Sequence, residues 1–180
     1  TQAVARSADP DRVLAYFRDA KPRVPVGSLA LVKAYLALGR AADAETEAIR
    51  AWTELEFTAP EEDSLMALMS DALSVAHEVR LDRVLWADRA PEARRMLPRV
   101  GNDWRKLAEA RLALRAQTNG ASGLVDAVPK AVAGDAGLAH RKHIGHGHRP
   151  AFALRAFGIG NARTQRQPTP GDAPGALLLE

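Results

Sequence analysis

Cysteine is absent from this sequence of 180 residues, which excludes disulfide bonds and thiolate metal sites. No run of about 18 apolar residues occurs, so the sequence predicts no membrane-spanning helix. The chain also begins at Thr1 without a methionine or an apolar signal core, and we therefore expect a processed or truncated product. What remains is 47% apolar and 26% charged residues. That balance is typical of a folded domain or an arc of several helical repeats.

Charge is divided unevenly along the chain. Residues 1–139 hold 19 Lys and Arg against 20 Asp and Glu, a net charge of −1. Residues 140–180 hold 6 against 2, a net charge of +4. The basic character therefore comes from the C-terminal part, and the neutral body does not favour nucleic-acid binding, which requires a basic face on the fold.

Helical patterns with clear ends fill the first 139 residues. Asp9-Pro10 is a capping residue followed by proline in the first turn, and Gly39 is a suitable left-handed stop. We expect Ser28 to cap a helix that ends at Gly39, and the next helix to lie close against it through Ala44 and Ala48. Large residues on one helix and alanines on its partner are typical of tetratricopeptide-like pairs. The spacing between pairs is irregular, which favours a divergent superhelix.

Residues 81–116 predict three short helices separated by two turns. Pro91 suits the first turn of the second helix, and Asp103 suits the N-cap of the third. We expect Ser74 to cap the helix that enters this stretch, and a further short helix over 124–132 despite Pro129. Each helix is too short to fold alone, so we predict an all-α fold with at least six helices over 9–133. The predicted arrangement is a right-handed superhelix, or solenoid, of short helix pairs.

The same stretch carries a family resemblance. The string HEVRLDRVLW, then A-R-R-M-L-P, then W-R-x-L-A-E-A-R-L-A-L resembles the periplasmic soluble lytic murein transglycosylases over Asp9 to Leu138. The likeness is to their non-catalytic α-superhelical region. Its most specific residues are Arg80, Asp82, Leu85, Trp86, Ala110, Arg111 and Leu112.

The resemblance implies a scaffold in the periplasm that serves a peptidoglycan-cleaving enzyme. Such enzymes cut the bond between N-acetylmuramic acid and N-acetylglucosamine with one carboxyl group and leave a 1,6-anhydro product. The family's catalytic domain carries an E-S pair and a G-L-M-Q run, and neither occurs here. We therefore expect no catalytic residue, no cofactor and no metal in this chain. The implied partners are glycan strands and a lysozyme-like catalytic domain of the parent chain.

Charged and aromatic side chains have functional and structural interpretations. The glutamates fit solvated helix faces or first turns, at positions 45, 47, 54, 56, 61, 62, 78, 92 and 109. The three tryptophans could stack on sugars, but each lies on an apolar helix stripe, which favours the core: Trp52, Trp86 and Trp104. Five arginines could meet glycan carboxylates, but neighbouring Asp82, Glu92 and Glu109 favour surface pairing: Arg80, Arg83, Arg94, Arg95 and Arg111. For Arg111, a buried pairing within the superhelix is the alternative.

Histidines gather where the helical pattern stops. His140, His143, His146 and His148 could supply nitrogens to zinc or nickel. Gly145 and Gly147 break helical geometry there, so a flexible basic tail is the favoured interpretation. Residues 140–180 are rich in Gly, His, Pro and Arg, and we predict that they are disordered. A free-standing tetratricopeptide-like module that binds a protein is the alternative function of the helical part.

We predict a shifted reading frame as the origin of residues 140–180. Shifted codons in a high-GC gene yield Arg, Gly, Pro, Ala and His, and this composition begins abruptly after Gly137, Leu138 and Ala139. An evolved linker has a similar composition and is the alternative. Translation of the source DNA in the other two frames beyond codon 139 is expected to restore Leu and Ala at helical spacing. Two frames without such periodicity would rule out the shift.

Overall fold

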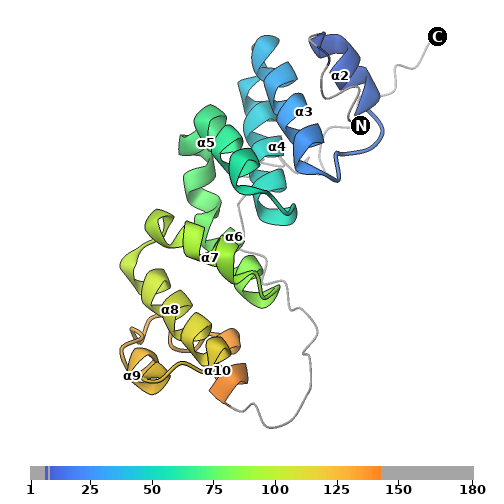
Figure 1. Ribbon diagram of the computed structural model, residues 1–180. Coiled ribbons are helices and arrows are strands. Elements are labelled where there is room, and N and C mark those ends of the chain that lie inside the picture. Colours follow the sequence, from blue (N-terminus) through green and yellow to red (C-terminus); the bar gives the residue numbers. More distant parts are fainter. Residues whose placement is uncertain (1–6, 8, 143–180) are drawn as a thin grey trace, which may run out of the picture. The chain divides into compact units, whose positions relative to one another are not determined.

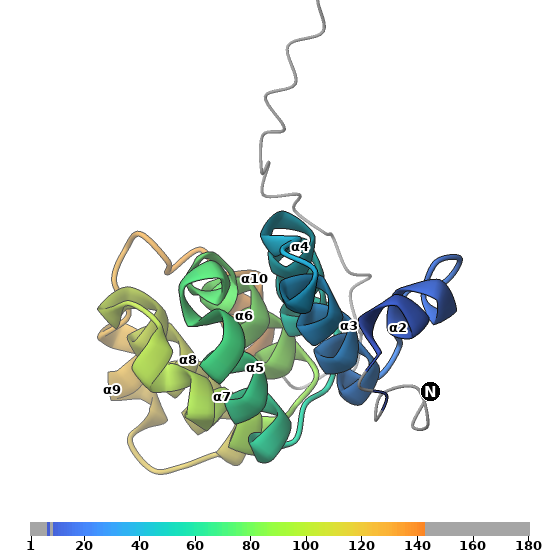
Figure 2. The ribbon, with the colours of Figure 1, turned by 90° about the horizontal axis from the view of Figure 1, so that it is seen from above.

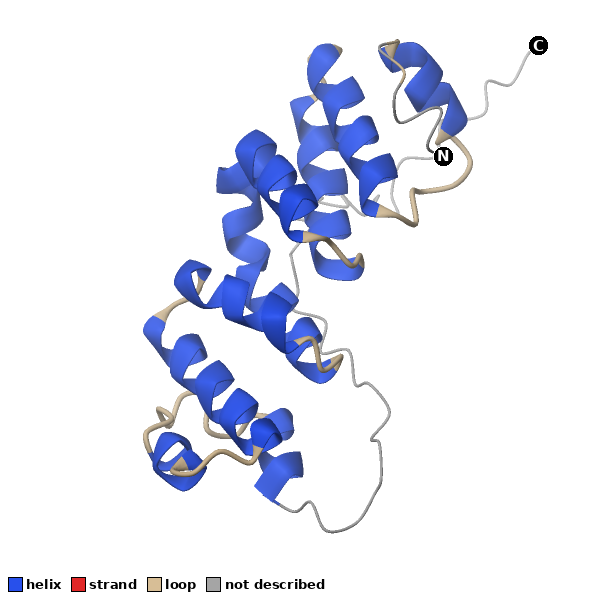
Figure 3. Ribbon diagram, in the orientation of Figure 1, coloured by secondary structure: helices blue, strands red, loops and turns tan. Residues whose placement is uncertain are grey.

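The computed structural model describes Ser7 and residues 9–142, with only the backbone for 140–142. The described residues form α-helices and two short 3₁₀-helices joined by turns, and they contain no strand (Figure 3). Eight α-helices lie between Pro10 and Asp126, which confirms the all-α prediction of at least six. None of the helices in this part of the chain is both long and apolar enough to cross a bilayer. The predicted disorder of 140–180 concerns residues that lie almost entirely outside this description.

The first helix, α2 (Pro10–Tyr16), is capped as predicted. One carboxylate oxygen of Asp9 accepts hydrogen bonds from the backbone N–H of Asp11 at 3.0 Å and of Arg12 at 3.3 Å. The next helix, α3 (Pro25–Ala37), starts three residues before Ser28, so the predicted cap at Ser28 is wrong. Proline in a first turn loses no hydrogen bond, so the helix can begin at Pro25. Ser28 is buried instead and accepts a hydrogen bond from Arg50.

Close packing of α3 against α4 (Ala41–Glu54) follows the predicted pattern. Gly39 separates the two helices with φ +69°, a conformation that costs glycine little. Ala44, Ala48 and Ala51 are fully buried on α4 and let the helix axes approach. Figures 1 and 2 both show α4 lying alongside α3.

An interrupted helix leads into the centre of the chain. In α5 (Ala59–Leu73), Thr58 and Glu61 form a capping box, and the backbone leaves helical geometry at Met69 with φ −141° and ψ 28°. A 3₁₀-helix, η1 (Ser74–Ala76), then joins α5 to α6 (His77–Trp86). The predicted cap at Ser74 is wrong, because its hydroxyl donates backwards to the carbonyl of Asp71.

Three further elements complete the stretch 81–116. Pro91 lies in the first turn of α7 (Ala90–Met96), as predicted. The 3₁₀-helix η2 (Leu97–Arg99) follows, and α8 (Asn102–Ala116) then begins one residue before Asp103. The predicted N-cap is therefore wrong by two positions, since Gly101 occupies it and Asp103 lies in the first turn.

The last two helices are α9 (Ala121–Asp126) and α10 (Ala136–Lys142). The prediction of a helix over 124–132 is wrong at both ends. Proline disfavours helical geometry in the residue before it, and α9 accordingly stops short of Pro129. The backbone of α10 extends three residues beyond Ala139, the boundary expected from composition.

Contacts join each helix mainly to the next one or two elements. Alongside the consecutive pairs, α3 contacts α5, α4 contacts α6, α6 contacts α8, and α8 contacts α10. The largest apolar core runs through α3 to α8 and includes Trp52, Phe57, Leu65 and Leu81. A smaller cluster joins Leu107 of α8 to Leu138 of α10 and to Val128 in the segment before α10. Each helix is therefore held by neighbours that are close in sequence.

Replacement of Trp52 by alanine is expected to lower the free energy of unfolding by about 3–5 kcal/mol, since a fully buried indole leaves a cavity. Urea unfolding followed by circular dichroism measures the change. The matched control is Trp104→Ala, because Trp104 is only partly buried at the edge of the same core and should cost less. Equal costs for the two variants would contradict the placement of Trp52 at the centre.

Candidate functional site

A buried carboxylate shared by two arginines lies where α5, α6 and α7 meet. Glu62 is 1% exposed. Its Oε1 accepts from Arg80 Nη2 at 2.6 Å, and Arg95 donates to Oε2 at 2.7 Å and to Oε1 at 3.1 Å. Two cations therefore converge on one anion inside the protein.

Arg80 is itself completely buried, and its guanidinium meets rings as well as oxygens. It lies 4.2 Å from the centre of the Trp52 ring and 5.1 Å from that of Phe57. Its Nη1 also donates to the Trp52 carbonyl at 2.9 Å. A desolvated cation over an aromatic face is favourable by about 2 kcal/mol or more. We call Arg80, Glu62, Arg95, Trp52 and Phe57 the Arg80 cluster.

The connection between α4 and α5 is held by arginines on either side of the Arg80 cluster. Arg83 Nη2 donates to the Leu55 carbonyl at 2.6 Å. Arg89 forms ion pairs with Glu56 and Glu92. The Leu55 carbonyl and the Glu56 carboxylate thus hold this turn against α6 and the start of α7, where Glu92 also pairs with Arg89.

The charges inside the cluster shift one another's pKa values. Burial raises the pKa of Glu62, but hydrogen bonds and charges from Arg95 and Arg80 outweigh burial and leave its pKa below the ordinary value. Burial lowers the pKa of Arg80, and Glu62 offsets only part of that effect. A carboxyl group with a lowered pKa is a poor proton donor near neutral pH, so Glu62 does not suit general acid catalysis.

A second buried arginine joins α6, α8 and the start of α10. Arg111 is 4% exposed, and its Nη1 donates to Asp82 at 2.6 Å and, more weakly, to Asp135 at 3.4 Å. The guanidinium lies 5.0 Å from the centre of the Trp86 ring. Asp135 also accepts from the backbone N–H of Leu138 at 2.8 Å, which caps α10. We call Arg111, Asp82, Asp135 and Trp86 the Arg111 cluster.

Gly137 makes the close approach of Arg111 to α10 possible. A Cβ atom at this position would lie 2.3 Å from the Cζ atom of Arg111. Gly137 and Leu138 therefore have packing roles: the glycine gives the guanidinium room, and Leu138 fills the core beside it.

Two carboxyl groups have raised pKa values, as an acid catalyst would require. Burial raises the pKa of Asp82, and Arg111 offsets part of the effect. Burial also raises the pKa of Glu78, against a hydrogen bond with Trp104. Neither residue lines the cavity of about 10 Å³ beside Asp88 or the hollow of about 300 Å³ at Leu124.

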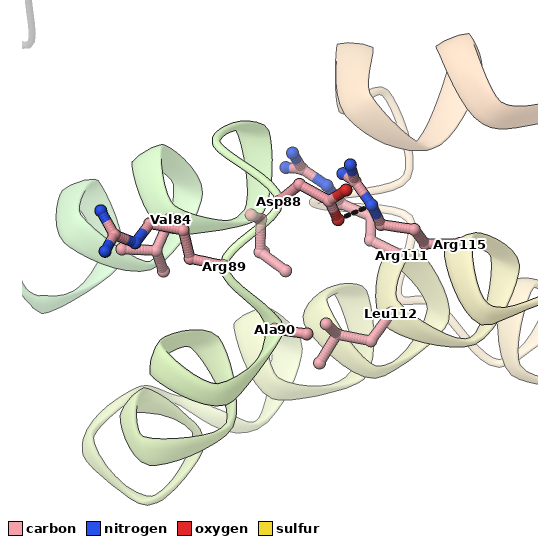
Figure 4. Close-up of a pocket in the computed structure, with 8 residues that line it drawn as sticks. Val84, Asp88, Arg89, Ala90, Arg111, Leu112 and Arg115 are labelled. Carbon is pink, nitrogen blue, oxygen red and sulfur yellow. Dashed lines mark ion pairs between the residues drawn. The ribbon is translucent and has the colours of Figure 1, made fainter.

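Figure 4 shows the small cavity between the turn after α6 and α8. Its volume of about 10 Å³ suits one water molecule. Asp88 faces Arg115 across it in an ion pair, while the head of Arg89 points away. A shallower hollow of about 300 Å³ has an apolar floor that includes Leu112 and Leu124, with Arg94 and Glu109 among its lining residues.

Several expected positions are corrected by these contacts. Glu47, Glu62 and Glu92 are buried and not on solvated faces, because arginines pair with all three. Arg80 likewise lies inside the protein and not in a surface pair, and the buried alternative holds for Arg111. For Glu62, Arg80 and Arg111, sequence spacing alone could not reveal this, since their partners are distant in the chain.

The tryptophans divide into one core residue and two at its margin. Trp52 is fully buried, as predicted. Trp86 and Trp104 are only partly buried; Trp104 packs against the core, as favoured, whereas Trp86 is not among the core residues. Both contact charged groups: Trp86 lies against Arg111, and Trp104 hydrogen-bonds with Glu78.

The four histidines considered as metal ligands have side chains that the structure does not describe. The side chain of His140 is not described, and His143, His146 and His148 lie outside the described residues. Within the described part, no group of three or more His, Cys, Asp or Glu is arranged to hold a metal ion. Asp135, His77 and Gly137 were not singled out from sequence as site residues. The position of Asp135 directly before the helix that begins at Ala136 could have drawn attention to it.

Comparison of the chain with known family models, curated sequences and solved structures finds no match. The interpretation of the two clusters therefore depends on their own contacts.

Replacement of Glu62 by glutamine is expected to cost about 3–5 kcal/mol of unfolding free energy, because Arg80 would remain buried without a counter-charge. Urea unfolding at pH 7 measures the loss. The control Glu54→Gln removes a carboxylate that is 60% exposed and should cost less than about 1 kcal/mol.

The pH dependence of the Glu62→Gln effect has a defined sign. A lowered folded-state pKa stabilises the fold above the ordinary pKa of 4.5, and this stabilisation is lost as pH falls. The difference between the wild type and Glu62→Gln should therefore narrow below pH 4.5. A difference that is independent of pH would contradict the ionised state of Glu62.

Replacement of Gly137 by alanine is expected to lower stability, because the added methyl group would overlap the Arg111 guanidinium. The cost should be about 1–3 kcal/mol. Gly123 is a matched control: it lies in α9, and a Cβ there meets nothing within 4 Å. Gly123→Ala should stabilise the fold by about 0.5–1 kcal/mol. Thermal unfolding distinguishes the opposite signs, and a stabilising Gly137→Ala would contradict the contact.

Proposed function

We propose that this chain is part of the α-superhelical scaffold of a periplasmic peptidoglycan lytic transglycosylase. The carboxyl group that cleaves the bond between N-acetylmuramic acid and N-acetylglucosamine belongs, in this proposal, to a separate lysozyme-like domain of the parent enzyme. The helices described here hold that domain and let glycan strands approach it. This segment is itself inactive.

The single observation that carries the proposal is where the resemblance residues lie. Arg80 is the centre of one buried cluster, and Asp82, Trp86 and Arg111 belong to the other. The three remaining residues pack in or against the core: Leu85, Ala110 and Leu112. The motif thus consists of residues that fasten successive helices together. That role suits a scaffold, and it leaves the motif without a group aimed at substrate.

The order of helix contacts supports the same proposal. Contacts between elements one and two positions apart are what a solenoid of helix pairs requires, because each repeat touches only its neighbours. The Arg80 and Arg111 clusters follow this rule, since one joins α5, α6 and α7 and the other joins α6, α8 and α10. A right-handed superhelix of tetratricopeptide-like pairs is accordingly part of the proposal.

A free-standing module that binds another protein is the second candidate. It is favoured by Val75 in η1, which is 73% exposed, and by Val79 in α6, which is also exposed. Exposed apolar side chains near each other in the chain are suited to contact with a partner helix.

The genomic DNA distinguishes the two functions. If this is a transglycosylase scaffold, further helix pairs and a lysozyme-like domain with E-S and G-L-M-Q should be encoded downstream, in this frame or a shifted one. A gene that ends without such a domain in any frame would exclude the scaffold proposal and favour the binding module.

Inactivity of the purified chain on peptidoglycan is the biochemical expectation. Incubation with isolated sacculi should release no 1,6-anhydromuropeptides, because the E-S and G-L-M-Q motifs of the family's catalytic domain do not occur in this sequence. Chromatography with mass detection provides the measurement, and an active transglycosylase provides the positive control. Release that disappears in Glu78→Gln or Asp82→Asn would show that this chain is catalytic.

A further inference from the structure

The passage from α5 to α6 is the least regular part of the long central helices. The backbone of α5 is interrupted at Met69, and η1 turns the chain into α6. His77 is the first residue of α6 and is only 7% exposed. An ionisable ring is therefore buried directly beside a break in helical structure.

His77 and Arg80 together hold the end of α4 against the start of α6. The indole Nε1 of Trp52 donates to His77 Nδ1 at 3.2 Å, and the two rings lie 5.8 Å apart. The guanidinium of Arg80 stacks on the Trp52 ring and donates a hydrogen bond to the Trp52 carbonyl oxygen. Two of the links from α6 to α4 thus converge on Trp52.

The hydrogen bond fixes the protonation state of His77. An indole N–H can only donate, so Nδ1 must accept and the imidazole must be neutral with its proton on Nε2. A second proton, on Nδ1, would place an imidazole N–H opposite the indole N–H of Trp52, and neither could accept. Protonation therefore removes this link between α4 and α6 and puts a repulsive contact in its place.

The charged surroundings of His77 oppose protonation as well. From α4 the ring meets the uncharged Trp52, while Arg80 of α6 and Arg99 of η2 act on it as cations. The carboxylate of Glu62 on α5 is already bound by Arg80 and by Arg95 of α7. The carboxylate of Glu78, the next residue after His77, is already hydrogen-bonded to Trp104 of α8. Burial, then Arg99 and Arg80, lower the pKa of His77 below its ordinary 6.5.

We propose that His77 is a proton-sensitive latch between α4 and α6, which holds Trp52 when neutral and releases it on protonation in mildly acidic conditions. Release would loosen α4 from the start of α6 beside η1, while the Glu62–Arg80 ion pair still joins α5 to α6. The inference depends on the Trp52–His77 contact alone and applies equally to a scaffold and to a binding module.

The direction of the pH effect follows from the lowered pKa. The unfolded chain takes up a proton near pH 6.5, whereas the folded chain resists until the pH is lower. The latch therefore stabilises the fold fully above pH 6.5, and this stabilisation is lost progressively as the pH falls.

Fluorine NMR of the full chain labelled with 5-fluorotryptophan tests the latch between pH 8 and pH 5. The three tryptophan signals are assigned with single Trp→Phe variants. The Trp52 signal is expected to move along a one-proton curve with a midpoint below pH 6.5. Protection of the Trp52 and Arg80 amides against hydrogen exchange should fall over the same range.

The matched control is His77→Gln, whose side-chain oxygen can accept the indole N–H but does not titrate. Its Trp52 signal should stay constant from pH 8 to pH 5. The hydrogen-exchange protection of its Trp52 and Arg80 amides should also stay constant over this range, whereas that of the wild type falls. A wild-type Trp52 signal that does not titrate, or one that titrates equally in His77→Gln, would overturn the proposal.

A second variant keeps the test decisive if His77→Gln does not fold. Replacement of His140, His143, His146 and His148 by glutamine leaves His77 as the only histidine in the chain. Nitrogen NMR of this variant should show neutral imidazole with the proton on Nε2 at pH 7 and a midpoint below 6.5. A midpoint at or above 6.5, or a proton on Nδ1 at pH 7, would overturn the latch.

Discussion

The carboxylate of Glu62 is the point on which the central helices depend. Two guanidinium groups from two different helices meet it inside the protein, and one of them is in turn covered by the rings of Trp52 and Phe57. Removing charges from water is unfavourable, so such a site persists only where every partner is in place. Glu62 therefore ties the correct packing of α5, α6 and α7 to one another. Apolar residues of similar size would stabilise the same space without demanding those particular partners.

Arg111 has the corresponding role further along the chain, in a different way. Its guanidinium lies between two carboxylates, and one of these, Asp135, simultaneously caps α10. The close approach is permitted by a missing side chain at Gly137. Helix capping, ion pairing and close packing thus all involve Arg111, Asp135 and Gly137. The contacts that join α6 to α8 therefore also position α10.

Capping and turn residues were sufficient to predict most of the helices. They could not predict the ion pairs between residues that are distant in the sequence. Asp9, Gly39 and Pro91 act within a few residues of their own position, and the sequence is sufficient to recognise them. Glu62 looked like a solvated first-turn carboxylate because its partners lie 18 and 33 residues away. Whether a charge is buried depends on which helices meet, and no periodicity within one helix contains that information. The small errors at Ser28 and Asp103 have a related cause, because several residues near each helix start could serve as the cap.

The distance in sequence between Glu62 and its partners has a consequence for the order of folding during synthesis. The contacts of α2, α3 and α4 with one another are complete as soon as α4 has left the ribosome, since they use nearby residues. Helix α5 then emerges with a carboxylate whose two counter-charges are not yet made, and Arg95 comes last. The Arg80 cluster is therefore complete only after α7, and until then α5 contacts α3 and α4 while the core residues that later meet α6 to α8 are uncovered. During that interval the nascent chain presents a surface suited to chaperones and open to aggregation.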